Sequence, residues 1–281
     1  MESIGTMDVF ARLGEARDAF LSMNSGAPAR YVGELLTGVH PRHLLMEPIL
    51  VPFGVTLYLG LKPHFTLACR KLGTNGKSKL FKLFVLIHNL LLCAYSTWTA
   101  SNVVLMTISH LRNEGVESVY CKKNLWHSGL HYWGFLFYLS KYWELVDTLL
   151  LIVKGRSPSY LQVYHHAVTI ICAYALQVSH ASVTFIFVGL NSTVHSIMYA
   201  YYALTVIGVR LKGKSLITSM QIVQFLSGIA LACPMFFLKN GKCANPAQKL
   251  AVGVLILHAF YLTKLFVDFY CETYRRKAKA A

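Results

Sequence analysis

Long apolar segments separated by short polar connections fill the chain from about residue 45 onward. Each is close to the ~20 residues that an α-helix needs to cross the ~30 Å hydrocarbon core of a bilayer. None alternates as a membrane β-strand does, and only helices and closed barrels satisfy their backbone hydrogen bonds in lipid. We therefore predict an all-α, polytopic membrane protein. Its seven predicted transmembrane helices are residues 45–67, 81–107, 131–153, 160–178, 182–207, 216–237 and 248–270.

The predicted organisation is one helical domain, 45–270, between two short flanking segments. Residues 1–44 lack the basic start and apolar stretch of a cleavable signal peptide, and we expect them outside the membrane or at its surface, on the lumenal side. Residues 271–281 form a basic tail. Lys277 and Lys279 stand fifth and third from its end, a spacing that matches a receptor-read retrieval address for the endoplasmic reticulum. The alternative is a plain basic juxtamembrane tail.

Composition agrees with a membrane protein. Hydrophobic residues make up 55% of the chain and charged residues only 14%, and the mean hydropathy is +0.46. The net charge of +15 comes from Lys and Arg in short connections, which form no continuous face and so do not indicate nucleic-acid binding. The basic connections at 62–82, 154–159 and 208–215 fall on the same side as the tail. The positive-inside rule makes that side cytosolic and the N-terminus lumenal.

Ionisable side chains within apolar segments are the clearest sign of function. Such groups are costly in a membrane and normally face a protein-lined cavity. Lys141, Glu144 and Asp147 are three residues apart, which places them on one face of a helix. Asn191 and His195 are four apart on another segment. Single polar residues can serve only as hydrogen bonds between helices, but so many at one level predict a site.

Depth along the helices supports the same conclusion. His165 lies about six residues inside the cytosolic start of its segment, and Asp147 about six before the cytosolic end of its own. Gln221 lies about five residues from the start of the sixth segment. At ~1.5 Å per residue these groups share a layer ~8–10 Å below the cytosolic surface. We therefore predict a polar pocket that opens to the cytosol and has apolar walls beyond.

Four motifs in series resemble the ELO family of membrane very-long-chain fatty-acid elongases, over residues from about 40 to the tail. The matching motifs are Lys141-x-x-Glu144-x-x-Asp147-Thr148, Gln162-x-x-His165-His166, Asn191-x-x-x-His195-x-x-Met198-Tyr199-x-Tyr201-Tyr202 and Thr218-x-x-Gln221-x-x-Gln224. The family usually has His where this chain has Gln162. That Gln resembles a variant of elongases for polyunsaturated acyl chains in algae and other lower eukaryotes.

The resemblance implies that six helices surround a closed acyl tunnel and that the first packs outside. It implies condensation of a long-chain acyl-CoA with malonyl-CoA to 3-oxoacyl-CoA, carbon dioxide and CoA, with no bound cofactor or metal. Implied partners are membrane lipid and the reductase, dehydratase and enoyl reductase of the endoplasmic reticulum. A homodimer is compatible with the sequence. The resemblance also implies a disulfide between Cys121 and Cys243, for which two free thiols are the alternative.

Roles follow from the resemblance together with general chemistry. A neutral imidazole can be a nucleophile, so His165 is the candidate acyl acceptor, although His165 could instead act only as a base in a direct condensation. His195 is expected to contact the malonyl or oxyanion group. His166, Glu144 and Asp147 would orient the imidazoles. Lys141 would pair with Glu144 or contact substrate. The predicted substrate-binding residues are Thr148, Gln162, Asn191, Tyr199, Tyr202, Gln221 and Gln224. The candidates for binding CoA phosphates are Lys154, Arg156, Arg210, Lys212, Lys214 and Lys264.

Two other functions remain alternatives. A di-iron desaturase or hydroxylase also uses histidine pairs, and His127 and His131 offer a second spacing. However, Asp147, at the level of His165, lies 16 residues after His131, or ~24 Å along a helix, which is too far for one metal cluster. A transporter with a polar midplane is the second alternative. Transporters often contain internal repeats, and the halves of this chain show none.

Overall fold

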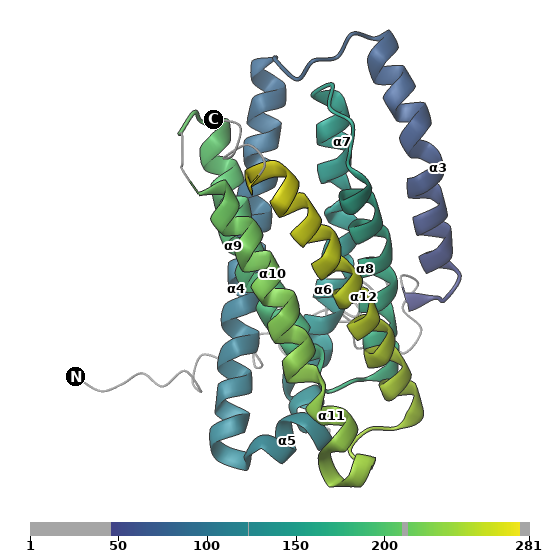
Figure 1. The fold of residues 1–281 in the computed structure, drawn as a ribbon, viewed down its shortest axis with the longest axis vertical. Helices are drawn as coiled ribbons and strands as arrows, with labels where there is room; N and C mark the ends of the chain where they lie inside the picture. Colours follow the sequence, from purple (N-terminus) through teal and green to yellow (C-terminus); the bar gives the residue numbers. More distant parts are fainter. Residues whose placement is uncertain (1–45, 123, 210–212, 276–281) are drawn as a thin grey trace, which may run out of the picture. The chain divides into compact units, whose positions relative to one another are not determined.

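The computed structural model describes residues 46–122, 124–209 and 213–275. All regular elements within these residues are helical, and residues from Pro48 onward form one compact unit (Figure 1). The N-terminal segment 1–44, Arg210, Lys212 and the two lysines of the predicted retrieval address lie outside the described residues. The prediction of an all-α protein is confirmed for the part that is described.

The chain order of the elements is simple, because long helices follow one another through short connections. The long helices are α3 (Leu50–Lys71), α4 (Lys79–Glu114), α6 (His131–Trp143), α7 (Leu145–Val153), α8 (Tyr160–Ser179), α9 (Thr184–Val206), α10 (Lys214–Ala232) and α12 (Pro246–Tyr270). The short elements are α5 (Val116–Cys121), the π-helix η2 (Trp126–Leu130), α11 (Pro234–Phe237), the 3₁₀-helix η3 (Leu238–Gly241) and the π-helix η4 (Cys271–Arg275).

Three helical stretches among the described residues are long and apolar enough to cross a membrane: Lys79–Glu114, Lys214–Phe237 and Pro246–Tyr274. The other predicted spans coincide with α3, α6–α7, α8 and α9. Polar side chains within α6–α9 lower the hydropathy of these segments. Their crossing of a membrane therefore remains a prediction.

Local chemistry determines where the helices begin, and here the structure corrects some predicted bounds. Ser78 caps α4 by accepting a hydrogen bond from the amide of Phe81, so the helix begins before the apolar run does. It continues past the predicted end at residue 107, because hydropathy marks the apolar part of a helix and not the helix itself. The first helix begins later than predicted, at Leu50, and Pro52 lies in its first turn, where proline costs no hydrogen bond.

The third predicted span is two helices. α6 ends and α7 begins around Glu144, whose backbone stays in the right-handed helical region at φ −63° and ψ −18°. The helix is therefore interrupted at Glu144 although the backbone stays in helical geometry. Lys141 and Asp147 lie on opposite sides of this interruption.

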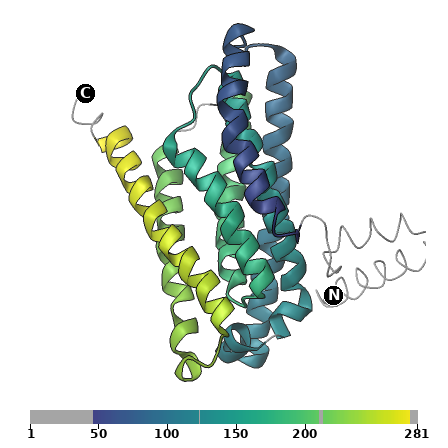
Figure 2. The ribbon, with the colours of Figure 1, turned by 90° about the vertical axis from the view of Figure 1, so that its right-hand side faces the viewer.

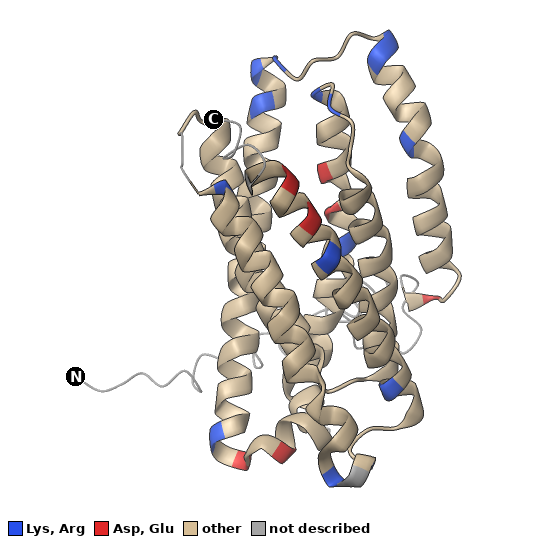
Figure 3. Ribbon diagram, viewed as in Figure 1, with Lys and Arg blue, Asp and Glu red and all other residues tan. Residues whose placement is uncertain are grey.

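Packing between helices brings distant segments together. α4 packs along α9, α9 against α10, α10 against α12, α12 against α8, and α8 against α6 (Figures 1 and 2). α3 packs against α7 and α8. Lys and Arg lie mainly towards the helix ends (Figure 3). Acidic and basic side chains also lie together within α6–α7. The polar residues of α6–α9 therefore face a shared interior.

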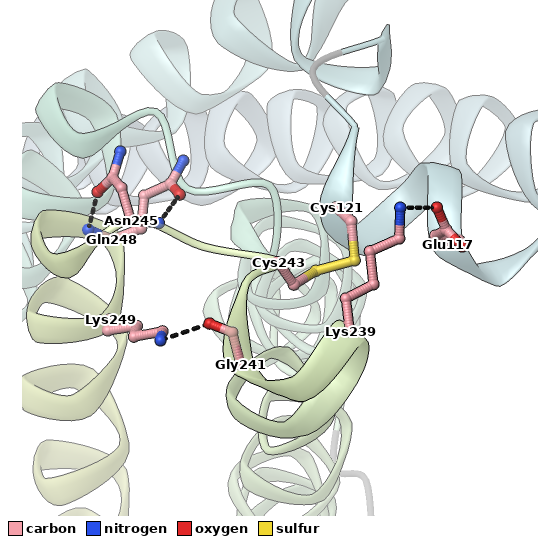
Figure 4. The surroundings of a disulfide bond; sticks show 8 residues. All are labelled: Glu117, Cys121, Lys239, Gly241, Cys243, Asn245, Gln248 and Lys249. Carbon is pink, nitrogen blue, oxygen red and sulfur yellow. Dashed lines mark hydrogen bonds and ion pairs between the residues drawn. A yellow bond between two sulfur atoms is a disulfide. The ribbon is translucent and has the colours of Figure 1, made fainter.

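A disulfide fastens one end of this bundle. Cys121, at the end of α5, is bonded to Cys243, in the connection before α12 (Figure 4). Beside it Lys239 and Glu117 form an ion pair, and the Lys249 ammonium donates to the Gly241 carbonyl oxygen at 2.6 Å. The bond joins positions 122 residues apart, and cross-links that close long loops restrict the unfolded chain most. It therefore ties the connection after α4 to the one before α12.

Candidate active site

A buried ion pair forms the centre of the site. The Lys141 ammonium donates to Glu144 Oε1 at 2.6 Å and to Asn191 Oδ1 at 2.8 Å, and it lies 4.1 Å from the centre of the Phe137 ring. Lys141 and Glu144 are only 3% and 4% exposed. The spacing of three on α6 brings the pair together, and Asn191 reaches it from α9. Of the two predicted roles for Lys141, the structure shows the pairing with Glu144.

Glu144 also contacts the imidazole of His195. The distance from Glu144 Oε1 to His195 Nδ1 is 3.5 Å, and His195 is 6% exposed. Because a carboxylate at one ring nitrogen sets the orientation of an imidazole, the Nδ1 edge of His195 faces protein and Nε2 is the nitrogen left for a ligand. The Lys141–Glu144 pair thus contacts two residues of α9, Asn191 through the ammonium and His195 through the carboxylate.

Asp147 belongs to a different set of contacts. Its Oδ1 lies 2.8 Å from His88 Nε2, and its Oδ2 accepts a hydrogen bond from the Tyr199 hydroxyl at 2.7 Å. The indole of Trp143 donates to His88 Nδ1 at 3.2 Å. An indole N–H can only donate, so Nδ1 carries the lone pair and Nε2 carries the proton that is donated to Asp147. Asp147 therefore orients His88, and its contacts do not include the histidines predicted from the sequence.

His88 is a site residue that sequence reasoning missed. It lies on α4 and is 2% exposed. The sequence held one signal for it, because an isolated histidine inside a predicted transmembrane segment is itself a candidate functional group. His88 does not belong to any of the periodic polar patterns from which the site was predicted.

Thr148 joins three helices through its hydroxyl. Its Oγ1 lies 2.9 Å from the Tyr58 hydroxyl on α3, 3.3 Å from His166 Nδ1 and 3.4 Å from Gln162 Nε2, both on α8. Thr148 is fully buried. Gln162 and His166, both predicted at the site, thus each contact the hydroxyl of Thr148, which was also predicted there. Tyr58 was not predicted, because a single tyrosine in an apolar helix gives no distinct signal.

His165 points elsewhere than His166. Successive helix positions differ by about 100°, and the centres of the two rings are 5.6 Å apart. His165 lines a cavity between α6, α8, α9, α10 and α12. The other lining residues are Phe137, Thr169, Cys172, Ala173, Leu176, Phe187, Leu190, Asn191, Gln224, Phe225, Gly228, Leu255, His258, Ala259 and Leu262. The cavity is therefore mainly apolar. Of the two adjacent histidines His165 and His166, His165 is the one whose imidazole would contact a ligand in the cavity.

The remaining predicted residues are divided between the cavity and other places. Gln224 lines the cavity, whereas Gln221 Nε2 lies 3.5 Å from Met198 Sδ on α9. Tyr202 is 39% exposed and contacts the rings of Tyr199 and Tyr201. The stripe predicted on α9 is thus only partly buried.

The candidate phosphate-binding residues that the structure describes lie on the surface. Lys154, Arg156 and Lys214 are exposed. Lys264 is also exposed, and its ammonium is 2.8 Å from Asp268 Oδ2 one turn later on α12. This pairing partly neutralises Lys264 and makes it the weakest of the described candidates for binding an anion.

No three His, Cys, Asp or Glu side chains among the described residues are grouped so that they could hold a metal ion. His131, half of the second histidine pair, has Nδ1 3.0 Å from the Trp126 carbonyl oxygen. The described part of the chain therefore offers no ligand set for the di-iron alternative.

Comparison with known proteins adds independent information. The sequence profile of the family described as "ELO: GNS1/SUR4 family" matches residues 43–281. "Fatty acid elongase 2" of Trypanosoma brucei brucei is 29% identical over 81% of this chain and 90% of its own length. "Fatty acid elongase sre1" of Dictyostelium discoideum is 31% identical over 73% and 77%. "Long chain fatty acid elongase 1" of Caenorhabditis elegans is 34% identical over 67% of each chain.

Proposed function

The chain belongs to the ELO (GNS1/SUR4) family, and from this we propose that it catalyses the condensation of a long-chain fatty acyl-CoA with malonyl-CoA. The products are 3-oxoacyl-CoA, carbon dioxide and CoA, which makes this the first step of two-carbon fatty-acid elongation. Its relatives named fatty acid elongases support elongation as the process. The observation that carries the reaction type is the position of His165 in the wall of a mainly apolar cavity.

The proposed first half-reaction is acyl transfer to His165. A neutral ring nitrogen attacks the thioester carbonyl, the carbon–sulfur bond breaks, and the sulfur leaves with the ring proton as CoA thiol. Malonyl-CoA then loses carbon dioxide, and the electron pair of the broken carbon–carbon bond forms an enolate. The enolate attacks the acyl-imidazole carbonyl, which forms the new carbon–carbon bond and breaks the bond between the acyl carbon and the ring nitrogen. The ring then takes up one proton from water, which replaces the proton lost with CoA and returns His165 to its neutral state.

His195 and Asn191 are proposed to serve the second half-reaction. Glu144 holds one edge of the His195 ring, so Nε2 can contact the malonyl group or the developing oxyanion. Asn191 Oδ1 accepts a hydrogen bond from the Lys141 ammonium, which directs the amide N–H₂ of Asn191 away from the ammonium. Asn191 also lines the cavity. Hydrogen-bond donors fixed in place before the reaction are the usual means of stabilising such charge.

We propose the following membrane architecture. Seven helices cross the membrane of the endoplasmic reticulum, with the N-terminus lumenal and the C-terminus cytosolic. Six of them surround the acyl tunnel, and α3 lies outside, which its packing against α7 and α8 supports. The disulfide lies at the predicted lumenal end, where oxidation is permitted. Lys154, Arg156 and Lys214, with Arg210 and Lys212, would bind CoA phosphates from the cytosolic side.

A polyunsaturated acyl substrate is part of the proposal and rests on Gln162. This residue contacts the hydroxyl of Thr148, next to His166. It therefore affects the shape of the pocket through its neighbours.

The product also requires a ketoreductase, a dehydratase and an enoyl reductase to complete the elongation cycle. This follows because a 3-oxo group must be reduced, dehydrated and reduced again to give a saturated chain.

The test is an assay on membranes that contain the chain. Labelled malonyl-CoA is supplied with saturated and polyunsaturated acyl-CoAs of sixteen to twenty carbons, without NADPH, so that the cycle stops at the condensation product. We expect labelled 3-oxoacyl-CoA, with the highest rate for a polyunsaturated chain. No product from any acyl-CoA, in protein shown to be folded, would refute the proposed reaction. A saturated preference would refute only the substrate class.

His88 is expected to act as a positioning residue for this reaction. His88→Leu removes a hydrogen bond from the Asp147 carboxylate and an acceptor from the Trp143 indole. Support of this kind around a site is typically worth ~10–100-fold, so we expect the condensation rate to fall by about that factor. His88→Gln, whose amide can place an N–H near the same carboxylate, should recover part of the rate. Equal losses in both variants would indicate a packing role only.

A further inference from the structure

Two polar atoms in the wall of the cavity have no hydrogen-bond partner in the described part of the structure. They are His258 Nε2 on α12 and Thr169 Oγ1 on α8. His258 is 6% exposed, so this nitrogen is also shielded from solvent. Buried polar groups are nearly always paired, and an exception needs an explanation. Both atoms belong to residues of one cavity, which suggests that a ligand in it supplies the missing partner.

The hydrogen bond at Nδ1 of His258 determines whether Nε2 of the same ring is a hydrogen-bond donor or acceptor. Nδ1 lies 3.2 Å from the Tyr164 hydroxyl, and no other acceptor for that hydroxyl is found among the described residues. We assign the hydroxyl as the donor to Nδ1, and in the neutral imidazole the proton is then on Nε2. His258 thus presents an N–H donor to the cavity.

Like Thr99 on α4, Thr169 has no hydrogen-bond partner for its hydroxyl among the described residues, unlike many other threonines within helices. Buried in a helix, a threonine hydroxyl commonly donates to the carbonyl oxygen four residues earlier. Five threonines of the described helices do so at 2.7–2.8 Å: Thr66, Thr97, Thr107, Thr193 and Thr263. Thr169 makes no such bond, and its hydroxyl is a second free donor beside the cavity.

Both donors lie beyond His165, away from the start of α8. Thr169 follows His165 by four residues, or ~6 Å along the helix. Contact between the rings of Tyr164 and Tyr261 at 4.9 Å sets the register of α8 against α12, which run in opposite directions. His258 comes three residues before Tyr261 and is therefore about level with a point three residues after Tyr164. An acyl group on His165 would pass this level within its first few carbons.

We propose that His258 and Thr169 form a subsite that favours acyl chains with a hydrogen-bond acceptor close to the thioester. This inference rests on the proposed function and deepens it. The acceptor is either the π-bond of a carbon–carbon double bond, which accepts weakly, or a hydroxyl oxygen. A saturated chain would cover both donors and leave them unpaired, and an enzyme discriminates against a substrate that leaves buried polar groups unsatisfied.

The experiment compares acyl-CoAs of equal length. One is saturated, one has a cis double bond near the carboxyl end, one has it near the methyl end, and one has a hydroxyl near the carboxyl end. kcat/KM is measured for the wild type, Thr169→Val and His258→Phe. Each variant should lower the preference for a carboxyl-end acceptor over the saturated chain by about two- to tenfold. Thr169→Ser keeps the donor and should keep the preference. The double-bond and hydroxyl substrates show which acceptor is used.

Two results would overturn the subsite. An unchanged preference in both variants would mean that water satisfies the donors, and an equal loss on every chain would mean a general structural or carbonyl-binding role. A second measurement separates this inference from the proposed function. Thermal stabilisation of the purified protein by each acyl-CoA reports binding without turnover. Loss of this selectivity in Thr169→Val but not Thr169→Ser would support the subsite even where no condensation occurs, and identical stabilisation by all four chains in the wild type would refute it.

Discussion

Replacing His165 with alanine is expected to abolish condensation, with a fall in rate on the order of 10³–10⁶-fold, as when a covalent nucleophile is lost. His165 is the imidazole of the adjacent pair that lines the cavity. His166 is a matched control on the same helix, because its Nδ1 is engaged by Thr148. His166→Ala should retain more activity than His165→Ala, since it disturbs only the support of the site.

The covalent route has its own readout. Wild-type protein incubated with acyl-CoA alone should release CoA and gain the mass of one acyl group on the peptide that contains His165. His165→Ala should show neither. If the wild type condenses but never carries an adduct, His165 acts as a base in a direct condensation. If His165→Ala remains active at the wild-type rate, the assignment of His165 is wrong.

Breaking the Lys141–Glu144 pair should cause the largest loss of stability. Lys141→Met leaves the Glu144 carboxylate buried with only His195 beside it, and uncompensated buried charges typically cost ~3–5 kcal/mol. We expect a sharply lower thermal midpoint in detergent. The double variant Lys141→Met/Glu144→Gln removes both charges and should recover much of that stability.

The double variant also separates stability from catalysis. It lacks the carboxylate that orients His195, so it should be folded but slow in condensation. A double variant as unstable as Lys141→Met would show that the cost does not come from an unpaired charge. A double variant that is both stable and fully active would remove Glu144 from the mechanism.

The periodic pattern of polar residues predicted contacts within a helix and between some neighbours. Lys141 meets Glu144 because a spacing of three places both on one face, and α9 delivers Asn191 and His195 to the same place. The pattern could not give the rotation of one helix about another. For this reason the contacts of Asp147 with His88 on α4 and Tyr199 on α9 could not be predicted.

The site residues that could not be predicted from the sequence are those outside the periodic patterns of polar residues. His88, Tyr58 and His258 are scattered polar side chains in mainly apolar helices, and their roles depend on which helix lies opposite. Thr169 could not be predicted for another reason. Its notable feature is that its hydroxyl lacks a hydrogen bond, which only the structure shows. Distinguishing such residues from ordinary packing requires the three-dimensional arrangement.

The hydroxyl of Tyr58 has a consequence for exchanging parts between relatives. α3 is the first described helix and packs mainly against α7 and α8, which makes it an obvious segment to replace. Yet its Tyr58 hydroxyl lies 2.9 Å from the Thr148 hydroxyl that contacts His166. A chimera that takes α3 from a donor with phenylalanine at this position would keep every motif residue and still release Thr148 from one of its three contacts. Junctions for hybrid enzymes should therefore treat α3 and the α7–α8 segment as a single inherited block.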